Sequence, residues 1–325
     1  MYLKLFRSKG LLLFFSTIFL LYSCQYSSSS TLYVEKLDSV STLSIDTMPS
    51  IDTIPVVTEN VSGLSQRWDS LQRNLLVFPA DSLHPIAINI QKRVLKDSLR
   101  RAFDKYPKHV FLTFDDGPLV GSAAIDSIAR AKSIKISAFL VGRHAQMSKS
   151  RKKDIERYRT NPYVACYNHS FTHAGNKFNT FYNNPAAAFA DFEKNETELG
   201  LQQKIVRLPG RNIWVYDDVR RIDLQNSSGT ADLLHTHGYR IFGWDVEWRI
   251  QRTTGVPVQP LNEVFNRIRN YMNNKSSMKP NNVVLLMHDD MFQTQKGKQL
   301  LVQLIDSLQK QNYTFEFMED YPIRY

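Results

Sequence analysis

Short apolar segments alternate with amphipathic segments along most of this chain. The apolar segments that predict strands are residues 110–114, 136–141, 163–167, 205–208, 239–244, 283–287 and 313–318. Between them, apolar residues at helical spacing predict helices near residues 123–131, 149–158, 186–199, 231–234, 261–272 and 299–309. Strands separated by helices are typical of a parallel α/β sheet or barrel. In such folds the active site gathers at the carboxyl ends of the strands.

The sequence before residue 108 has a different pattern. Residues 25–63 are rich in Ser and Thr, contain a small Ser-Ile-Asp-Thr repeat, and lack the apolar residues needed for a core. They are therefore interpreted as a disordered tether. In residues 64–107 apolar side chains return at helical spacing, namely Leu64, Trp68, Leu71, Leu75, Ile90, Val94 and Phe103. This segment is predicted to be a small helical lead-in, and residues 108–325 to be the main domain.

The amino terminus indicates export. Three basic residues precede the apolar stretch 11–22, which is too short to span a bilayer and ends in Leu21-Tyr22-Ser23-Cys24. This ending resembles the bacterial lipobox, which implies that residues 1–24 are a lipoprotein signal peptide and that Cys24 carries lipid. An ordinary secretory signal and a signal-anchor are the alternatives. In each case the main domain lies outside the cytoplasm, and the lipoprotein interpretation places it on a bacterial membrane, in the periplasm or at the cell surface.

Composition adds two limits. The chain has 325 residues, a net charge of +10 and two cysteines, Cys24 and Cys166. If Cys24 carries lipid, no intramolecular disulfide can form, and Cys166 is expected to be a small buried side chain. No Lys/Arg-rich module interleaved with aromatic residues is present, so we do not expect a nucleic-acid partner.

Five predicted strands deliver polar residues to the same edge of the sheet. They end in the segments Asp115-Asp116-Gly117-Pro118, His169-Ser170-Phe171-Thr172-His173, Arg207-Leu208-Pro209-Gly210, Asp245-Val246-Glu247-Trp248 and Leu286-Met287-His288. Since a soluble chain would rarely place acids, histidines and an arginine together by chance, this combination predicts a catalytic site.

The spacing of His169 and His173 suggests a metal. On a helix, residues four apart share one face, so their imidazoles could bind one ion. The Glu that supplies the base in zinc proteases with such a pair is absent, so a third ligand and a base must come from elsewhere. The pair Asp115–Asp116 can supply both, because one carboxylate can bind the metal while the other takes a proton from its water.

Two further residues fit a hydrolytic reaction. A leaving amine or alkoxide needs a proton, which His288 could supply as imidazolium, although a lysine or a backbone donor could do the same. The backbone N–H of Gly210 is unobstructed by a side chain and could help the metal to hold an oxyanion.

These motifs, in this order, resemble the five motifs of the NodB-type polysaccharide deacetylases, carbohydrate esterase family 4. The resemblance spans residues 108–325 and implies a distorted (β/α)7 barrel that removes acetyl groups from an acetylated sugar polymer. It implies Asp115 as general base and His288 as general acid in a pocket bounded by Leu286. The implied metal ligands are Asp116, His169 and His173. Arg207 and an acid of the fourth motif would support the base and the acid, and Ser170 would help to hold the histidine loop.

Two motifs depart from the family pattern. An aromatic residue commonly follows Pro209 in the third motif, where this chain has Gly210. The fourth motif is one residue shorter than usual, so Glu247 is favoured as its functional acid and Asp245 remains possible, with Trp248 lining the substrate groove. Of the remaining candidates, Asp289 and Asp290 are interpreted as a solvated loop, and His144 receives no function.

The expected protein is a lipid-anchored, metal-dependent N-deacetylase of a cell-envelope glycan such as peptidoglycan, in which metal-bound water attacks the acetyl carbonyl. Zn²⁺ is the expected metal on ligand type, with Co²⁺, Ni²⁺ or Fe²⁺ as alternatives, and a monomer is expected. The competing hypotheses are an O-acetyl esterase acting on a xylan-type glycan and a non-catalytic glycan-binding lipoprotein. A metal-dependent phosphoesterase is disfavoured because the sequence offers no second set of metal ligands.

Overall fold

The structure is a computed structural model that describes residues 60–73, 85–251 and 253–323. The predicted signal peptide, Cys24 and nearly all of the predicted tether lie outside the described residues. No helix of the described part is long and apolar enough to cross a membrane.

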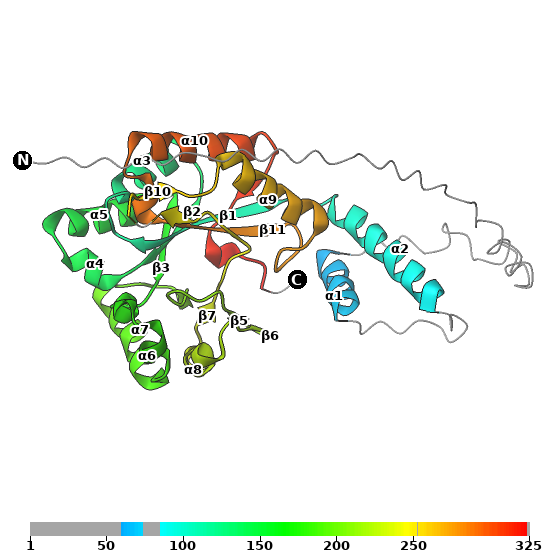
Figure 1. The fold of residues 1–325 in the computed structure, drawn as a ribbon, viewed down its shortest axis with the longest axis horizontal. Coiled ribbons are helices and arrows are strands. Elements are labelled where there is room, and N and C mark those ends of the chain that lie inside the picture. Colours follow the sequence, from blue (N-terminus) through cyan, green and yellow to red (C-terminus); the bar gives the residue numbers. More distant parts are fainter. Residues whose placement is uncertain (1–59, 74–84, 252, 324–325) are drawn as a thin grey trace, which may run out of the picture. The chain divides into compact units, whose positions relative to one another are not determined.

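A mostly parallel sheet forms the centre of the fold (Figure 1). Its strands occur in the spatial order β6-β5-β7-β4-β3-β2-β1-β11-β8, and β12 pairs with β1. The parallel strands are β1 (His109–Gly117), β2 (Ile136–Leu140), β3 (Val164–Asn168), β4 (Ile205–Val206), β7 (Arg240–Ile241), β8 (Val246–Glu247), β11 (Asn282–His288) and β12 (Thr314–Phe315). All seven predicted strands are present. The mixed α/β class is therefore confirmed, and the sheet is curled into a half-barrel.

Two antiparallel pairs were not predicted. The first is a hairpin of β5 (Trp214–Tyr216) and β6 (Val219–Arg221), which joins the edge of the main sheet through β7. The second is the separate pair β9 (Ile250–Gln251) and β10 (Val256–Pro257). Both consist of strands of two or three residues, which are too short to give a periodic signal.

Helices cover the sheet where the apolar spacing predicted them. They are α3 (Ser122–Lys132), α5 (Lys149–Thr160), α7 (Pro185–Leu199), α8 (Ser228–Thr236), α9 (Leu261–Asn274) and α10 (Gln295–Gln309). Shorter elements in the connections are α4 (Gly142–Gln146), α6 (Phe178–Tyr182) and the 3₁₀ helices η4 (His173–Asn176), η5 (Gln225–Ser227), η6 (Asp289–Phe292) and η7 (Met318–Asp320). Figure 1 shows α9 and α10 beside β1 and β11, and α6, α7 and α8 beside the other end of the curled sheet, near β5 and β7.

Two helices, α1 (Val61–Gln72) and α2 (Pro85–Phe103), precede the sheet. Trp68 of α1 packs edge-on against Phe103 of α2, with ring centroids 5.9 Å apart. The amide of Asn281, just before β11, donates to the carbonyl of Phe103 at 2.6 Å. The end of α2 is thus bound directly to the start of a central strand.

Strand alternation divides the core into two layers. In β1, Val110, Leu112 and Phe114 join a large cluster that includes side chains of α3, α9 and α10. Phe111 points the other way, into an aromatic cluster on the inner side of the curled sheet. Since side chains of a strand point alternately to its two faces, the residues in phase with Phe111 are directed toward the inner side.

Candidate active site

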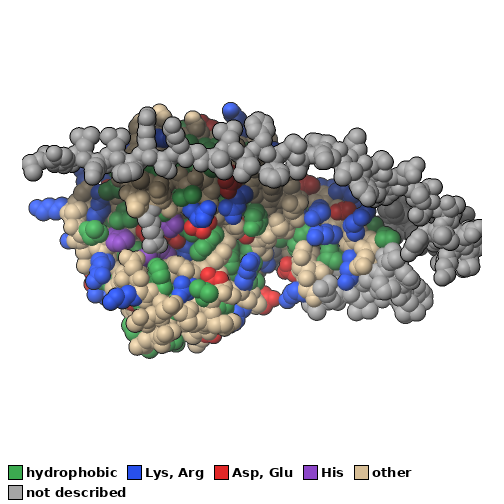
Figure 2. Space-filling model, in the orientation of Figure 1, with side chains coloured by type: hydrophobic (Ala, Val, Ile, Leu, Met, Phe, Trp, Pro, Cys, Tyr) green, Lys and Arg blue, Asp and Glu red, His purple; other side chains and the backbone are tan. Residues whose placement is uncertain are grey.

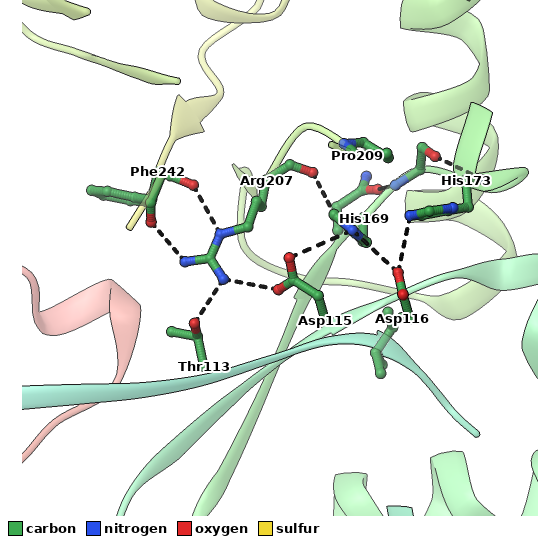
Figure 3. Close-up of polar contacts among 12 residues, drawn as sticks. Thr113, Asp115, Asp116, His169, His173, Arg207, Pro209 and Phe242 are labelled. Carbon is green, nitrogen blue, oxygen red and sulfur yellow. Dashed lines mark hydrogen bonds and ion pairs between the residues drawn. The ribbon is translucent and has the colours of Figure 1, made fainter. Parts of the chain in front are cut away.

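The candidate site is formed by residues in or directly after strands, with side chains that point to the inner side of the curled sheet. Thr113 and Asp115 follow Phe111 at intervals of two, and in the same way Arg207 follows Ile205 of the inner cluster. His169 follows the inner residue Tyr167, and His288 is in phase with Val284. The pairing of β1 with β11 sets Asp115 directly beside His288. One alternation rule therefore brings together residues that are far apart in the sequence (Figure 3).

Arg207 is fully buried and binds Asp115. One of its terminal nitrogens, NH1, donates to Oδ1 of Asp115 at 2.8 Å and to the hydroxyl of Thr113 at 2.7 Å. Its Nε and its other terminal nitrogen donate to the carbonyls of Phe242 and Gly243 at 3.1 and 2.8 Å. Among these described acceptors only Asp115 is a carboxylate, and it is only 3% exposed. The charge of the guanidinium is therefore paired with Asp115 alone.

Asp116 faces the two histidines rather than Arg207. Its Oδ1 lies 3.0 Å from Nε2 of His173 and 3.5 Å from Nε2 of His169. The other carboxylate, through Oδ2 of Asp115, lies 3.6 Å from Nε2 of His169. The adjacent acids thus have different partners, with Asp115 held by the arginine and Asp116 directed at the imidazoles.

The prediction that His169 and His173 share a helical face is wrong. His169 follows β3 directly, and the chain then turns through Ser170, which has a φ of 65°, and reaches His173 with a φ of 53°. The hydroxyl of Ser170 accepts from the backbone N–H of His173 at 3.0 Å, and Asp191 of α7 accepts from the N–H of Thr172. A turn of left-handed residues therefore brings the imidazoles to a ring separation of 5.2 Å, which spacing alone could not distinguish from a helix.

The tautomer of His169 is the one expected if a cation lies between His169, His173 and Asp116. Its Nδ1 lies 2.7 Å from the carbonyl of Arg207, which can only accept, so Nδ1 carries a proton. In the neutral ring the lone pair of Nε2 then points toward Asp115 and Asp116. Oδ1 of Asp116 is buried and receives no well-oriented hydrogen bond from the described residues. One nitrogen from each histidine and one oxygen of Asp116 lie within 4.8 Å of one another, as expected for three ligands of one ion.

The pKa shifts of Asp116 and His169 follow from the same contacts. Burial opposes the ionisation of Asp116, but contacts with His169 and His173 hold the pKa of Asp116 well below its usual value. Burial likewise opposes the charged form of His169, yet Asp115 and Asp116 raise the pKa of that imidazole. The site therefore favours a negative Asp116 beside a positive group, which is the charge arrangement of a metal site.

A cavity of about 840 Å³ opens over these residues. Its wall includes the predicted residues Asp115, Asp116, His169, His173, Gly210, Glu247, Leu286 and His288. Figure 2 shows histidine side chains on this face of the molecule with Lys and Arg side chains around them. The Nδ1 atom of His288 is buried and has no hydrogen-bond partner among the described residues.

Of the two acids of the fourth motif, only Glu247 lines the cavity. Asp245 instead accepts from the backbone N–H groups of Met278 and Val284, at 2.8 and 2.9 Å. Burial raises the pKa of Asp245 to about 7, against these two hydrogen bonds. The geometry therefore favours Glu247 as the acid that faces the site.

The prediction that Trp248 lines the substrate groove is wrong. Trp248 is 0% exposed and packs in the outer core with Val246, and its indole donates to the carbonyl of Gln259. Since Glu247 faces the cavity, strand alternation turns Trp248 to the opposite side. The tryptophan that does line the cavity is Trp244.

The cavity wall also contains Arg143, His144 and Phe178, which were not predicted from the sequence. Nδ1 of His144 lies 2.6 Å from the backbone carbonyl of Asp116, so this imidazole supports the loop that carries a predicted ligand. Arg143 and His144 lie in α4, which begins two residues after the end of β2, so the carboxyl-end rule points to them. Phe178 has no such signal.

Asp289 is a buried anchor rather than part of a solvated loop. It is 0% exposed and accepts from the N–H groups of Leu119 and Gly121 and from the hydroxyls of Ser122 and Tyr158. It therefore ties the end of β11 to the loop that follows Asp116.

Comparisons with known proteins agree with the site. Residues 104–213 match the family model for polysaccharide deacetylase, and this segment contains the first three of the five motifs. Over this segment, about a third of the chain, the match agrees with the predicted resemblance to NodB-type deacetylases. None of the curated proteins matches the chain.

Several solved structures are similar to this chain. A polysaccharide deacetylase of Bacillus cereus is 21% identical with a TM-score of 0.48, covering 67% of this chain and 97% of its own. The catalytic domain of a peptidoglycan N-acetylglucosamine deacetylase from Eubacterium rectale is also 21% identical, with a TM-score of 0.48 and coverage of 66% and 89%. A family 4 carbohydrate esterase of Streptococcus mutans is 19% identical with a TM-score of 0.49, covering 68% and 90%.

Proposed function

We propose that this protein is an extracytoplasmic, lipid-anchored, metal-dependent deacetylase that hydrolyses N-acetyl groups of a cell-envelope glycan. The observation that carries this proposal is the separation of the two acids at the end of β1. Asp115 is paired with buried Arg207, whereas Asp116 converges with His169 and His173 at the floor of an open cavity. The family match supports deacetylation as the reaction class.

Asp116, His169 and His173 would hold the divalent metal. Such an ion supplies a bound water of lowered pKa and polarises a carbonyl. Zn²⁺ suits these imidazole and carboxylate ligands, with Co²⁺, Ni²⁺ and Fe²⁺ as the other candidates. The carbonyl of Arg207 fixes the His169 ring so that Nε2 faces the site, and Ser170 fixes the backbone of His173.

Asp115 would accept the proton as the general base. Its Oδ1 is bound to Arg207, which leaves Oδ2 directed toward the site beside His169. The ion pair compensates the buried carboxylate charge, and the three other acceptors around the guanidinium hold Arg207 in place, so that Asp115 is kept in position. A base fixed in this way is available to the attacking water in each turnover.

His288 would return the proton as the general acid. It lies opposite Asp115 in the β1–β11 pairing, and its side chain borders the same cavity. A protonated imidazole there would donate to the leaving amine as the bond to the acetyl carbon breaks. The N–H of Gly210, on the cavity wall, would stabilise the negative charge that develops on the carbonyl oxygen.

The test is acetate release by the full-length chain from a panel of N-acetylated and O-acetylated glycans, with metal analysis of the same sample. We expect release from an N-acetylhexosamine polymer, and loss of at least a hundredfold in Asp115→Asn with unchanged metal content. Release from O-acetylated xylan alone would make the protein an esterase. Glycan binding with no acetate released in the presence of any divalent metal would leave only the non-catalytic hypothesis.

A further inference from the structure

Phe178 is an aromatic residue of the cavity wall that none of the five motifs contains. It is the first residue of α6, is half-buried, and lines the cavity above the predicted metal ligands. Its ring packs edge-on against the imidazole of His173, with centroids 5.7 Å apart and planes at 84°. One neighbour of this ring is therefore a predicted metal ligand.

Its other neighbour is Gly210. A Cβ atom at position 210 would lie 3.2 Å from Cε1 and Cζ of Phe178, closer than ordinary van der Waals contact. Residue 210 also has a φ of 64°, which glycine adopts without strain. The ring of Phe178 thus occupies the space into which a side chain at position 210 would extend, and it stands next to the N–H assigned to the oxyanion.

The position of α6 is fixed at both ends. At its last residue, the hydroxyl of Tyr182 donates to the carbonyl of Pro209 at 2.7 Å. At its first residue, the ring of Phe178 has the guanidinium of Arg211 5.8 Å from its centroid. Because Pro209 and Arg211 flank Gly210, the helix and the third-motif turn form one unit that presents the ring to the cavity.

The residues of the cavity wall lie at two depths, which distinguishes two places for parts of a substrate. Leu286, beside His288, is only 3% exposed, so it forms an inner part of the cavity wall, where we place the small acyl group. Phe178 is half-buried and Gly210 is exposed, so they form an outer part of the wall, where we place the larger sugar ring. A sugar ring has an apolar C–H face that an aromatic ring can cover, as in other apolar contacts of aromatic side chains.

We propose that Phe178 is the platform on which the sugar ring of the substrate packs while its acetyl group reaches toward Leu286 and His288. This inference rests on the proposed function, and it makes Phe178 a determinant of glycan affinity. A residue that only supported His173 would instead affect metal binding.

The test compares Phe178→Ala, Phe178→Leu and Phe178→Tyr in the full-length chain. Calorimetric binding of a chitin oligosaccharide to the zinc-loaded protein is measured together with kcat and KM for its deacetylation. We expect Phe178→Ala to weaken binding and raise KM about tenfold, with kcat within about twofold of wild type. Phe178→Tyr should restore most of the affinity, and Phe178→Leu should not, because it keeps apolar volume without an aromatic face.

Phe181→Ala is the matched control. Phe181 lies on the same helix but packs against Tyr182 and Phe192, and it is not part of the cavity wall. We expect this variant to lose thermal stability while keeping its affinity for the oligosaccharide. Zinc content and melting temperature are measured for all variants.

Three results would overturn the inference: wild-type affinity in Phe178→Ala, equal affinities in Phe178→Leu and Phe178→Tyr, or a fall in kcat that follows a loss of zinc. Its failure is distinguishable from failure of the proposed function. If wild type binds the oligosaccharide but releases no acetate, weaker binding by Phe178→Ala still supports the platform. If wild type releases acetate and Phe178→Ala binds equally well, only the platform is refuted.

Discussion

Replacement of Asp289 tests whether the loop after Asp116 is held by a buried carboxylate. In Asp289→Ala the N–H groups of Leu119 and Gly121 and the hydroxyls of Ser122 and Tyr158 lose their shared acceptor. The N–H of Leu119 keeps a second acceptor, the hydroxyl of Ser122 at 3.0 Å, and the hydroxyls can rotate. The N–H of Gly121, a buried residue, has no other described acceptor and bears most of the cost.

The expected loss can be estimated from these bonds. A buried donor left without an acceptor costs about 1–3 kcal/mol, and the other weakened bonds add roughly 1 kcal/mol. At pH 4, where Asp289 is neutral, we therefore expect Asp289→Ala to lower the free energy of unfolding by about 2–4 kcal/mol. At about 2–4 °C per kcal/mol for a domain of this size, the melting temperature should fall by roughly 5–15 °C.

Asp289→Asn gives a sharper test, because Asn resembles the neutral form of Asp289 and differs from its charged form. Burial raises the pKa of Asp289 from 3.8 to about 6, against the hydrogen bonds from Ser122, Tyr158 and Leu119. A carboxyl whose pKa is raised by folding stabilises the protein below its unfolded pKa, and this stability is lost as the pH rises through the folded value. A difference of about two pKa units corresponds to about 3 kcal/mol.

The assay is urea unfolding followed by circular dichroism at pH 4 and pH 7.5. Asn keeps the shape of the neutral acid, and both hydroxyls can rotate to accept from its amide. Wild type and Asp289→Asn should therefore be about equally stable at pH 4, and wild type should be less stable by about 3 kcal/mol at pH 7.5. A difference that does not change with pH would refute the raised pKa. An Asp289→Ala variant as stable as wild type at pH 4 would refute the anchoring role.

Two further predictions concern the site itself. Arg207→Lys should lower acetate release at least about a hundredfold with metal content retained, because one ammonium cannot satisfy the four acceptors around the guanidinium, and Asp115 is then poorly held; wild-type rates would contradict this role. A chelator should lower the melting temperature of wild type by several degrees, with recovery on adding ZnCl₂. In His173→Ala, which lacks one of the three proposed ligands, this zinc-dependent shift should disappear, and its persistence would place the ion elsewhere.

Most of the sheet could be predicted because long buried segments leave a clear pattern. β1 and β11 are apolar runs with turn residues after them, and both were found with nearly correct bounds. The rule that strand ends form the site then selected Asp115, His169, Arg207 and His288. These residues share one phase of alternation, so a single structural rule places all of them on the inner side of the sheet.

The wrong predictions have three different physical causes. Helical spacing was assumed for His169 and His173, but residues with positive φ connect them. Trp248 was assigned to the groove from its motif, although its phase opposite to Glu247 requires burial. Asp289 was interpreted as solvated because acidic pairs in loops usually are, and its four donors come from residues 119–158, which no local pattern links to it.

The different partners of Asp115 and Asp116 depend on one departure of the backbone from a regular strand. In a continuous strand adjacent side chains point to opposite faces, so the second acid would enter the outer core beside Phe114. Instead Asp116 has a φ of 71°, and the pairing of β1 with β2 shifts register between Phe114 and Gly117. A left-handed conformation of a residue other than glycine costs roughly 1–2 kcal/mol, so surrounding contacts must hold it. His144 binds the carbonyl of Asp116, and Asp289 fixes the loop beyond it. Residues outside the five motifs therefore maintain the turn that brings both carboxylates to one side of the sheet.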